Sequence, residues 1–289
     1  MTARNEDGVL VKSPYKKQEF TELELQDFMK CADPDTGPEY FLRNFFFIQH
    51  PVQGKIQYNP WEFQERLIKT YHNYRFSISM MPRQTGKSTS AAGYLLWFAM
   101  FKPDSTILVA AHKYAGAQEI MQRVRYSYEA CPDHIRAGAT SYNKGSIEFD
   151  NGSRIVAQTT TENTGRGMSI TLLYCDEFAF VRPTIAKEFW TSISPTLSTG
   201  GGAIITSTPN SDEDQFAFIW KGANKTEDEY GNTKELGVNG FKAYRAYWRE
   251  HPDRDEPWAE EQRNILGIER FRREMDCEFI INDETLIAP

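Results

Sequence analysis

The stretch Met81-Pro82-Arg83-Gln84-Thr85-Gly86-Lys87-Ser88-Thr89 decides the fold, because it places Gly-Lys-Ser between an apolar run and a helical pattern. The apolar run covers residues 76–81, and the helical pattern covers residues 86–101. A strand that turns directly into a helix through this tripeptide is typical of a phosphate-binding loop (P-loop). Backbone N–H groups at the helix N-terminus then surround phosphate oxygens. Met81 stands where the usual pattern has its first glycine, so the motif departs from the pattern there.

The side chains of this loop predict binding of ATP with Mg²⁺. Lys87 is expected to reach the β and γ phosphates, and Ser88 is expected to be a ligand of Mg²⁺. Arg83 is a long cation inside the loop, and from there it can reach the γ phosphate of the same subunit as a sensor or catalytic residue. Upstream, Gln64 carries an amide that can pair with an adenine edge. The predicted nucleotide-binding residues are Gln64, Arg83, Gln84, Thr85, Gly86, Lys87, Ser88 and Thr89.

A second motif, Asp176-Glu177, follows the apolar run 171–175. Open α/β sheets place ligands at such strand ends. We expect Asp176 to hold Mg²⁺ through its water shell, and Glu177 to orient and deprotonate the attacking water. The alternative is an exposed Asp-Glu pair at a junction between a strand and a loop.

Two further segments are candidates for a part in hydrolysis. Thr206, Ser207 and Thr208 end another apolar run, and a hydroxyl there could sense the γ phosphate and couple its loss to the next lobe; the alternative is a simple turn cap. Arg166 lies between Gly165 and Gly167, which suggests a mobile loop that presents a cation. The chain has no second P-loop domain that could supply a catalytic arginine within the same chain. Arg166 would therefore act as a catalytic finger between neighbouring subunits of a ring. The alternative is an ordinary surface arginine.

Short apolar runs alternate with helical patterns, which predicts an α/β fold of the P-loop NTPase class. The expected sheet is mainly parallel and flanked by helices, with strands at residues 76–81, 106–111, 171–175 and 203–207. The turn Asp150-Asn151-Gly152-Ser153 predicts a hairpin inserted before the third of these strands.

Composition changes suggest three parts. We expect a helical segment at residues 1–50 that packs with a small lid, the ATPase core at 51–225, and the lid at 226–289. Within the lid we expect a strand at residues 242–248 and helices at 257–281, with Asp255 as a cap and Gly267 as a break.

Composition excludes several other classes of protein. The chain has 289 residues and a net charge of -7. Its four cysteines are far apart and form no Cys-x-x-Cys pair, which argues against a zinc site and against a disulfide framework. The charge gives no general attraction to nucleic acid, so any DNA contact needs a local basic patch. No apolar run approaches the roughly 18 residues of a membrane span. We therefore expect a soluble protein in the cytoplasm that contacts no membrane.

The order of the motifs resembles the ATPase domain of the terminase large subunits of tailed bacteriophages, and the T4-like packaging motor is the most similar type. The segments that carry the resemblance are Gln64, 83–89, 143–148, Arg166-Gly167, 175–179 and 206–210. The resemblance implies a RecA/ASCE-like ATPase that moves double-stranded DNA into a prohead. Gln64 then corresponds to the adenine-reading glutamine, Arg166 to the finger that acts in trans, and residues 206–208 to the coupling motif.

The same resemblance implies partners and a location. These are double-stranded DNA, the portal protein of the prohead, the small terminase subunit, and further copies of the chain in a ring on the portal, with a monomer when isolated. The host cytoplasm is the implied location. In the family, a nuclease domain of RNase H type follows the ATPase. Because the sequence stops at Pro289, we expect an ATPase domain without nuclease activity.

Two other functions share part of this pattern. A superfamily 2 helicase has similar motifs but carries a second motor domain, for which the residues after Asn210 are too few. A nucleotide-dependent assembly clamp would bind ATP without turnover, and the presence of Glu177 argues against it.

Overall fold

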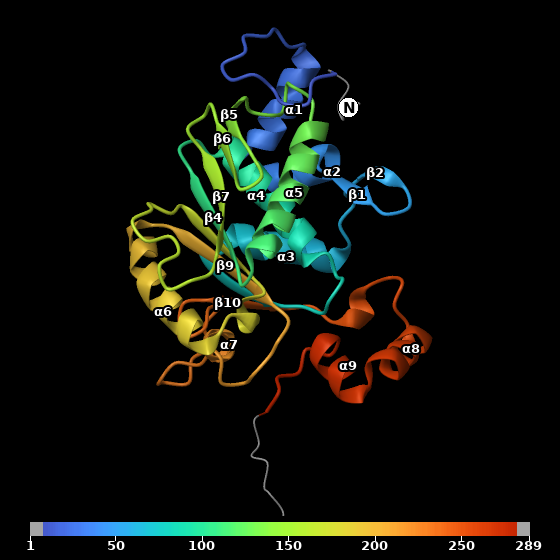
Figure 1. The fold of residues 1–289 in the computed structure, drawn as a ribbon, viewed down its shortest axis with the longest axis vertical. Coiled ribbons are helices and arrows are strands. Elements are labelled where there is room, and N and C mark those ends of the chain that lie inside the picture. The colour runs from blue at the N-terminus through green and yellow to red at the C-terminus, as the bar shows by residue number, and fades with distance from the viewer. Residues whose placement is uncertain (1–7, 282–289) are drawn as a thin grey trace, which may run out of the picture.

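The computed structural model describes residues 8–281, and within them one mixed sheet of eight strands forms the centre of the molecule (Figure 1). In spatial order the strands are β10 (Lys242–Arg245), β3 (Phe76–Met80), β9 (Gly202–Ser207), β8 (Leu172–Asp176), β4 (Thr106–Ala111), β7 (Arg154–Thr159), β6 (Ser146–Phe149) and β5 (Ala139–Tyr142). The first six run parallel to one another, β6 is antiparallel to β7, and β5 is antiparallel to β6. The predicted mainly parallel sheet is confirmed.

Helices cover both faces of this sheet, as the short apolar strands predict. One face packs against α3 (Glu62–Asn73), α4 (Lys87–Phe101) and α5 (Tyr114–Ala130), and the other against α6 (Pro183–Ile193) and α7 (Gln215–Asn224). Neighbouring residues of one strand alternate between the two cores: Val109 belongs to the first and Leu108 to the second. Short 3-10 turns η1 (Phe178–Phe180) and η2 (Ser194–Thr199) flank α6.

The hairpin predicted at residues 150–153, before the third of the predicted strands, is present, and it also belongs to the central sheet. It joins β6 to β7, and β7 pairs in parallel with β4 over the whole length of both strands. The hairpin therefore extends the central sheet. In β7 buried residues alternate with half-buried ones. The segment therefore lacks the continuous apolar run from which β3, β4, β8 and β9 were predicted.

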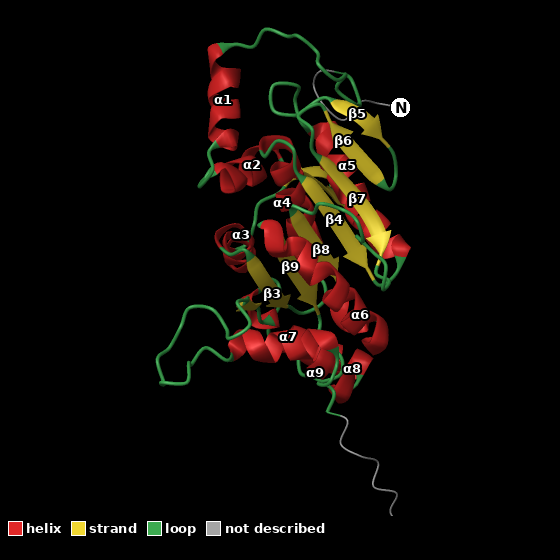
Figure 2. Cartoon of the chain, turned by 90° about the vertical axis from the view of Figure 1, so that its left-hand side faces the viewer, coloured by secondary structure: helices red, strands yellow, loops and turns green. Residues whose placement is uncertain are grey.

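Among the described residues, the N-terminal segment packs against α4 and α5 and not against the lid, contrary to our expectation. It contains α1 (Glu22–Ala32), α2 (Gly37–Phe45) and β1 (Phe47–His50), and β1 pairs with β2 (Gly54–Gln57) in a separate hairpin. Helix α1 lies at the opposite end of the molecule from α8 and α9 (Figure 1, Figure 2). The reason is the apolar face of α2, which packs against α4: a Cβ added at Gly93 of α4 would lie 2.4 Å from Leu42 Cδ2. A capping box of Thr21 and Glu24 starts α1.

The lid itself is smaller than predicted. It contains η3 (Trp248–Glu250), α8 (Glu256–Leu266) and α9 (Ile268–Glu274), which enclose a small core of Trp248, Ala259, Phe271 and Met275. The strand expected in the lid is β10, which instead joins the central sheet beside β3. Asp255 caps α8, and Gly267, with a φ of 80°, separates α8 from α9, as predicted. The last part of the predicted lid, residues 282–289, lies outside the described residues.

Between residues 8 and 281, no helix is both long enough and apolar enough to cross a membrane.

Candidate active site

The predicted site residues meet at the carboxyl ends of three neighbouring strands. The P-loop follows β3, Glu177 follows β8, and Ser207 ends β9, which lies between the other two. Parallel strands end at one edge of a sheet, and for this reason motifs that are far apart in the sequence come together here.

Lys87 and Glu177 form the centre of the site. Lys87 Nζ lies 2.6 Å from Glu177 Oε1, and the lysine side chain is only 8% exposed. Glu177 has left-handed backbone geometry, with a φ of 49°, which is uncommon for a residue with a side chain. The sharp turn aims its carboxylate back at the P-loop instead of continuing the direction of β8.

The end of β9 holds the other oxygen of Glu177. Ser207 Oγ and the backbone N–H of Thr208 each donate to Oε2 at 3.3 Å, and Thr208 Oγ1 donates at 3.4 Å. Burial opposes the charged form of Glu177, but the Lys87 ammonium and these hydrogen bonds hold its pKa below the usual value. Glu177 is therefore an ionised carboxylate at neutral pH. The third hydroxyl of the predicted coupling motif, Thr206 Oγ1, is buried and has no hydrogen-bonding partner among the described residues.

Asp176 and Ser88 lie next to this pair. Ser88 Oγ is 3.5 Å from Asp176 Oδ1, and the Tyr174 hydroxyl donates to the same oxygen at 2.9 Å. Burial and the neighbouring charge of Glu177 raise the pKa of Asp176 to about 6. A carboxylate in this setting is stabilised by a cation.

This donor set fits Mg²⁺ better than an ion that needs a complete protein cage. Among residues 8–281, no group of three or more His, Cys, Asp or Glu side chains surrounds a possible metal position. Mg²⁺ usually retains several waters and takes one or two protein oxygens together with substrate phosphates. Asp176 and Ser88 supply such oxygens.

The P-loop enters α4 through two residues with positive φ. Gly86 has a φ of 75°, and a Cβ added there would lie 2.5 Å from Gln64 Nε2. Gln84 has a φ of 56°, and Thr85 Oγ1 donates to Pro82 O at 2.8 Å within the turn. Thr89 follows in the first turn of α4. The loop thus needs glycine at position 86 for two reasons, its backbone conformation and the close approach of Gln64.

Gln64 is placed differently from the predicted adenine contact. Its side chain is buried and bonded to the protein at both ends: Nε2 donates to Thr85 O at 2.9 Å, and Oε1 accepts from Trp61 N at 3.1 Å and from the Tyr58 hydroxyl at 3.3 Å. Paired recognition of adenine needs an open acceptor and an open donor. In this structure Oε1 accepts two hydrogen bonds from the protein, and Nε2 holds the P-loop through the Thr85 carbonyl.

We therefore predict that Gln64→Ala acts on stability and not on the choice of base. The change leaves the buried Thr85 carbonyl, the Trp61 N–H and the Tyr58 hydroxyl without this partner, which costs about 1–3 kcal/mol of folding free energy. Thermal unfolding should shift to lower temperature, and the ratio of the affinities for ATP and GTP should stay unchanged. A selective loss of ATP binding, with GTP binding intact, would restore the adenine-reading role.

Arg83 makes contacts with the lid that the sequence did not predict. Its Nε forms an ion pair with the Glu274 carboxylate of α9, and its backbone N–H donates to Glu274 O at 3.1 Å. The Glu274 side chain is only 3% exposed, and a buried carboxylate needs cationic partners. Arg83 and Arg273 supply them, so the arginine of the P-loop is bound to the lid.

Arg166 is not part of this cluster. It is exposed on the loop after β7, and β4 separates that strand from β8. Gly165 and Gly167 have φ values of 71° and 78°, which confirms a turn that only glycine adopts easily. A role for Arg166 in hydrolysis would have to be exerted on another subunit.

Sequence reasoning missed three residues that contact the site. Tyr174 binds Asp176, Glu274 binds Arg83, and Arg254 donates to the backbone carbonyls of the P-loop. Tyr174 could have been found, because it lies two residues before Asp176 on the same strand and so faces the same side. Nothing in the local sequence marks Arg254 or Glu274.

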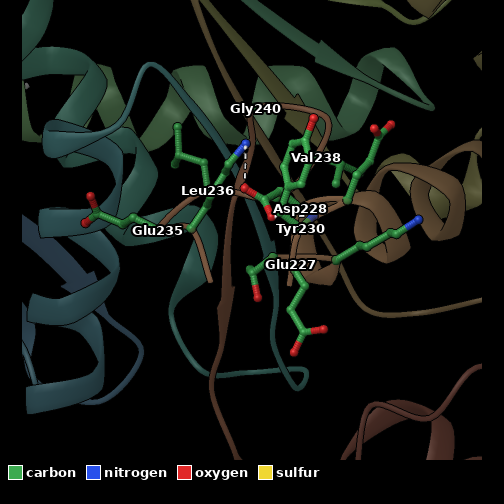
Figure 3. Close-up of a pocket in the computed structure, with 12 residues that line it drawn as sticks. Glu227, Asp228, Tyr230, Glu235, Leu236, Val238 and Gly240 are labelled. Atoms are coloured by element: carbon green, nitrogen blue, oxygen red, sulfur yellow. Dashed lines mark hydrogen bonds and ion pairs between the residues drawn. The ribbon is translucent and has the colours of Figure 1, made fainter. Parts of the chain in front are cut away.

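A hollow of about 980 Å³ lies elsewhere, in the segment 225–240 between α7 and β10 (Figure 3). Glu227, Asp228, Tyr230 and Glu235 surround it. No predicted site residue lines this hollow. Its four carboxylates outnumber its two lysines, so its net negative charge would repel a triphosphate. It is not the nucleotide site.

Comparison with known proteins agrees with this geometry. Residues 78–288 match the family described as terminase large subunit, T4likevirus-type, N-terminal. The chain belongs to the T4-like terminase large subunit family. The match covers the P-loop, both carboxylates and the lid helices, and it begins after Gln64.

Solved structures show the same fold for this terminase chain. The large terminase ATPase domain of Thermus phage P74-26 is 21% identical, with a TM-score of 0.60, over 77% of this chain and 95% of that one. The HK97 bacteriophage large terminase is 18% identical, with a TM-score of 0.63, over 82% of this chain and 53% of that one. The large terminase of a thermophilic bacteriophage in complex with ADP is 10% identical, with a TM-score of 0.59, over 76% and 53%. The chain thus spans about half the length of these last two proteins.

Proposed function

We propose that this terminase chain hydrolyses Mg-ATP and uses the energy to translocate double-stranded DNA into a prohead. The observation that carries the proposal is the contact of Lys87 with Glu177 at the carboxyl ends of three adjacent strands. Family membership supports the motor function. The bound ADP of one similar structure supports a nucleotide as the ligand.

The residues of the site have separate tasks in this proposal. The P-loop N–H groups and the Lys87 ammonium bind the β and γ phosphates, and the phosphates compete with Glu177 for the ammonium. Glu177, released from Lys87 and still held by Ser207 and Thr208, orients a water molecule and accepts its proton. The water oxygen bonds to the γ phosphorus, the bond to the bridging β-γ oxygen breaks, and ADP and inorganic phosphate result.

Ser88 and Asp176 would hold Mg²⁺. When bound, the ion neutralises charge that develops on the phosphate oxygens. We predict that EDTA in excess of Mg²⁺ reduces phosphate release to the level of the inactive variant Glu177→Ala, and that added Mg²⁺ restores the release. Turnover that is insensitive to EDTA would exclude a metal role for these two residues.

Double-stranded DNA, the portal protein and the small terminase subunit are the proposed partners, with the chain assembled as a ring on the portal in the host cytoplasm. This part of the proposal rests on family membership. It is tested by protection of DNA from nuclease in the presence of proheads. ATP-dependent protection that is lost with Glu177→Gln would support translocation, and equal protection with that variant would contradict it.

Arg166 is the proposed finger for the neighbouring subunit. If so, the rate of phosphate release per subunit rises with protein concentration, and Arg166→Ala abolishes the rise without weakening the binding of ATP. Arg182→Ala, which removes another exposed arginine, serves as the control. A rise that persists in Arg166→Ala would assign the finger to another residue.

A further inference from the structure

The P-loop contains a left-handed turn at Gln84. Gln84 has a φ of 56°, in the left-handed region where a Cβ comes close to the following carbonyl oxygen. Residues with side chains adopt this region rarely, and they do so where the surrounding structure holds them. Gln84 directly precedes the Thr85-Gly86-Lys87 segment that starts α4.

The lid holds this turn on two sides. Arg254 Nη2 donates to the carbonyl oxygen of Arg83 at 3.1 Å and to that of Gln84 at 2.8 Å. The N–H of Arg83 donates to Glu274 O at 3.1 Å. Two consecutive carbonyl groups of the P-loop are therefore fixed by one guanidinium group from a distant part of the sequence.

Arg254 is itself fixed in place. Its side chain lies in the loop before α8, and the residue is only 9% exposed. The guanidinium lies 4.6 Å from the ring centroid of Trp258, and that ring packs against Trp248 in the core of the lid. Burial of a cation is costly unless it makes strong hydrogen bonds. Arg254 makes them with the two P-loop carbonyls.

The direction of these carbonyls decides where the neighbouring N–H groups point. In a trans peptide the C=O of one residue and the N–H of the next point in opposite directions. When Arg254 binds the carbonyls of Arg83 and Gln84, the N–H groups of Gln84 and Thr85 are turned away from it. These N–H groups belong to the loop that takes the phosphates.

We infer that Arg254 is a positioning residue that holds the left-handed turn at Gln84, so that the P-loop is shaped for phosphate before a nucleotide arrives. This inference rests on the proposed function in one respect, namely that this loop binds the phosphates of ATP. It adds a contribution of the lid to phosphate affinity, made through backbone carbonyls alone.

The test is the equilibrium affinity for Mg-ADP, measured by calorimetry on the wild-type chain and four variants. Arg254→Ala should bind about tenfold more weakly, because the turn loses both hydrogen bonds. Glycine adopts positive φ freely, so Gln84→Gly makes the turn less dependent on the clamp. The loss of affinity caused by Arg254→Ala is therefore measured twice, once in the wild-type chain and once in the Gln84→Gly variant. We expect a clearly smaller loss in the Gln84→Gly variant.

Arg263→Ala is the matched control. Like Arg254, Arg263 lies over an aromatic ring of the lid, 4.7 Å from the ring centroid of Phe271, but its ion pair is with Glu256 and not with the P-loop. The control variant should bind Mg-ADP as the wild type does. If Arg254→Ala does not fold, Arg254→Met replaces it, because methionine keeps a long side chain that packs on Trp258 but has no group that donates to the two carbonyls.

Wild-type affinity in Arg254→Ala, or in Arg254→Met where that replaces it, would overturn the inference. So would an equal loss of affinity in the wild-type background and in the Gln84→Gly background, because the effect would then be independent of the turn. Failure of the proposed function is a different result, since in that case the wild-type chain itself would not bind Mg-ADP.

Discussion

Glu177→Gln is expected to lower the rate of ATP hydrolysis by about 10³-fold while Mg-ATP still binds. The amide has the size of the carboxylate but cannot accept the proton of the attacking water. It also no longer forms an ion pair with Lys87, which lies 2.6 Å from Glu177 Oε1 in the wild-type chain. Because the phosphates then compete with a weaker partner for Lys87, nucleotide affinity should stay the same or increase. Steady-state phosphate release and calorimetric binding measure the two effects separately.

Glu188→Gln is the control for this change, since Glu188 is exposed on α6 and the substitution alters net charge by the same amount. Its turnover should equal that of the wild type. Glu177→Gln with unreduced turnover would show that another group serves as the base. Loss of both binding and turnover would instead assign Glu177 to the structure of the site.

Lys87→Ala is expected to abolish turnover through loss of binding. The variant removes the buried ammonium and leaves Glu177 as a carboxylate without its cation, in the place where the phosphates would bind. Truncation of one partner of a buried charge pair costs about 3 kcal/mol, or roughly a hundredfold in affinity. Since Lys87 helps to hold the pKa of Glu177 below its usual value, that pKa should rise in the variant.

Lys187→Ala, which removes an exposed lysine of α6, is the matched control and should bind Mg-ATP normally. The melting temperature of each variant distinguishes lost binding from lost folding. Wild-type affinity for Mg-ATP in Lys87→Ala would place the triphosphate elsewhere on the molecule.

The centre of the site could be predicted because its signals are local. Gly86-Lys87-Ser88 lies directly between a strand and a helix, and Asp176-Glu177 and Ser207-Thr208 directly end strands. Strand ends of a parallel sheet meet at one edge, so correct assignment of the strands was sufficient to bring these residues together. The contact of Ser207 and Thr208 with Glu177 gives the predicted coupling motif a physical connection to the carboxylate.

The remaining contacts depend on partners distant in the sequence. The direction of Gln64 is set by the Thr85 carbonyl and that of Arg83 by Glu274, and no local pattern reveals either partner. The four half-buried residues of β10 resemble any amphipathic segment, and only their pairing with β3 makes them part of the central sheet. For this reason the strand at residues 242–248 was predicted to belong to the lid.

The most direct test of the central claim is Mg²⁺-dependent phosphate release from ATP over a series of protein concentrations, with Glu177→Ala as the blank. The account predicts release by the wild-type chain that needs Mg²⁺ and is absent from the blank at every concentration. Equal release by the wild-type chain and by Glu177→Ala would contradict it, because the hydrolysis would then not occur at the site formed by Lys87 and Glu177.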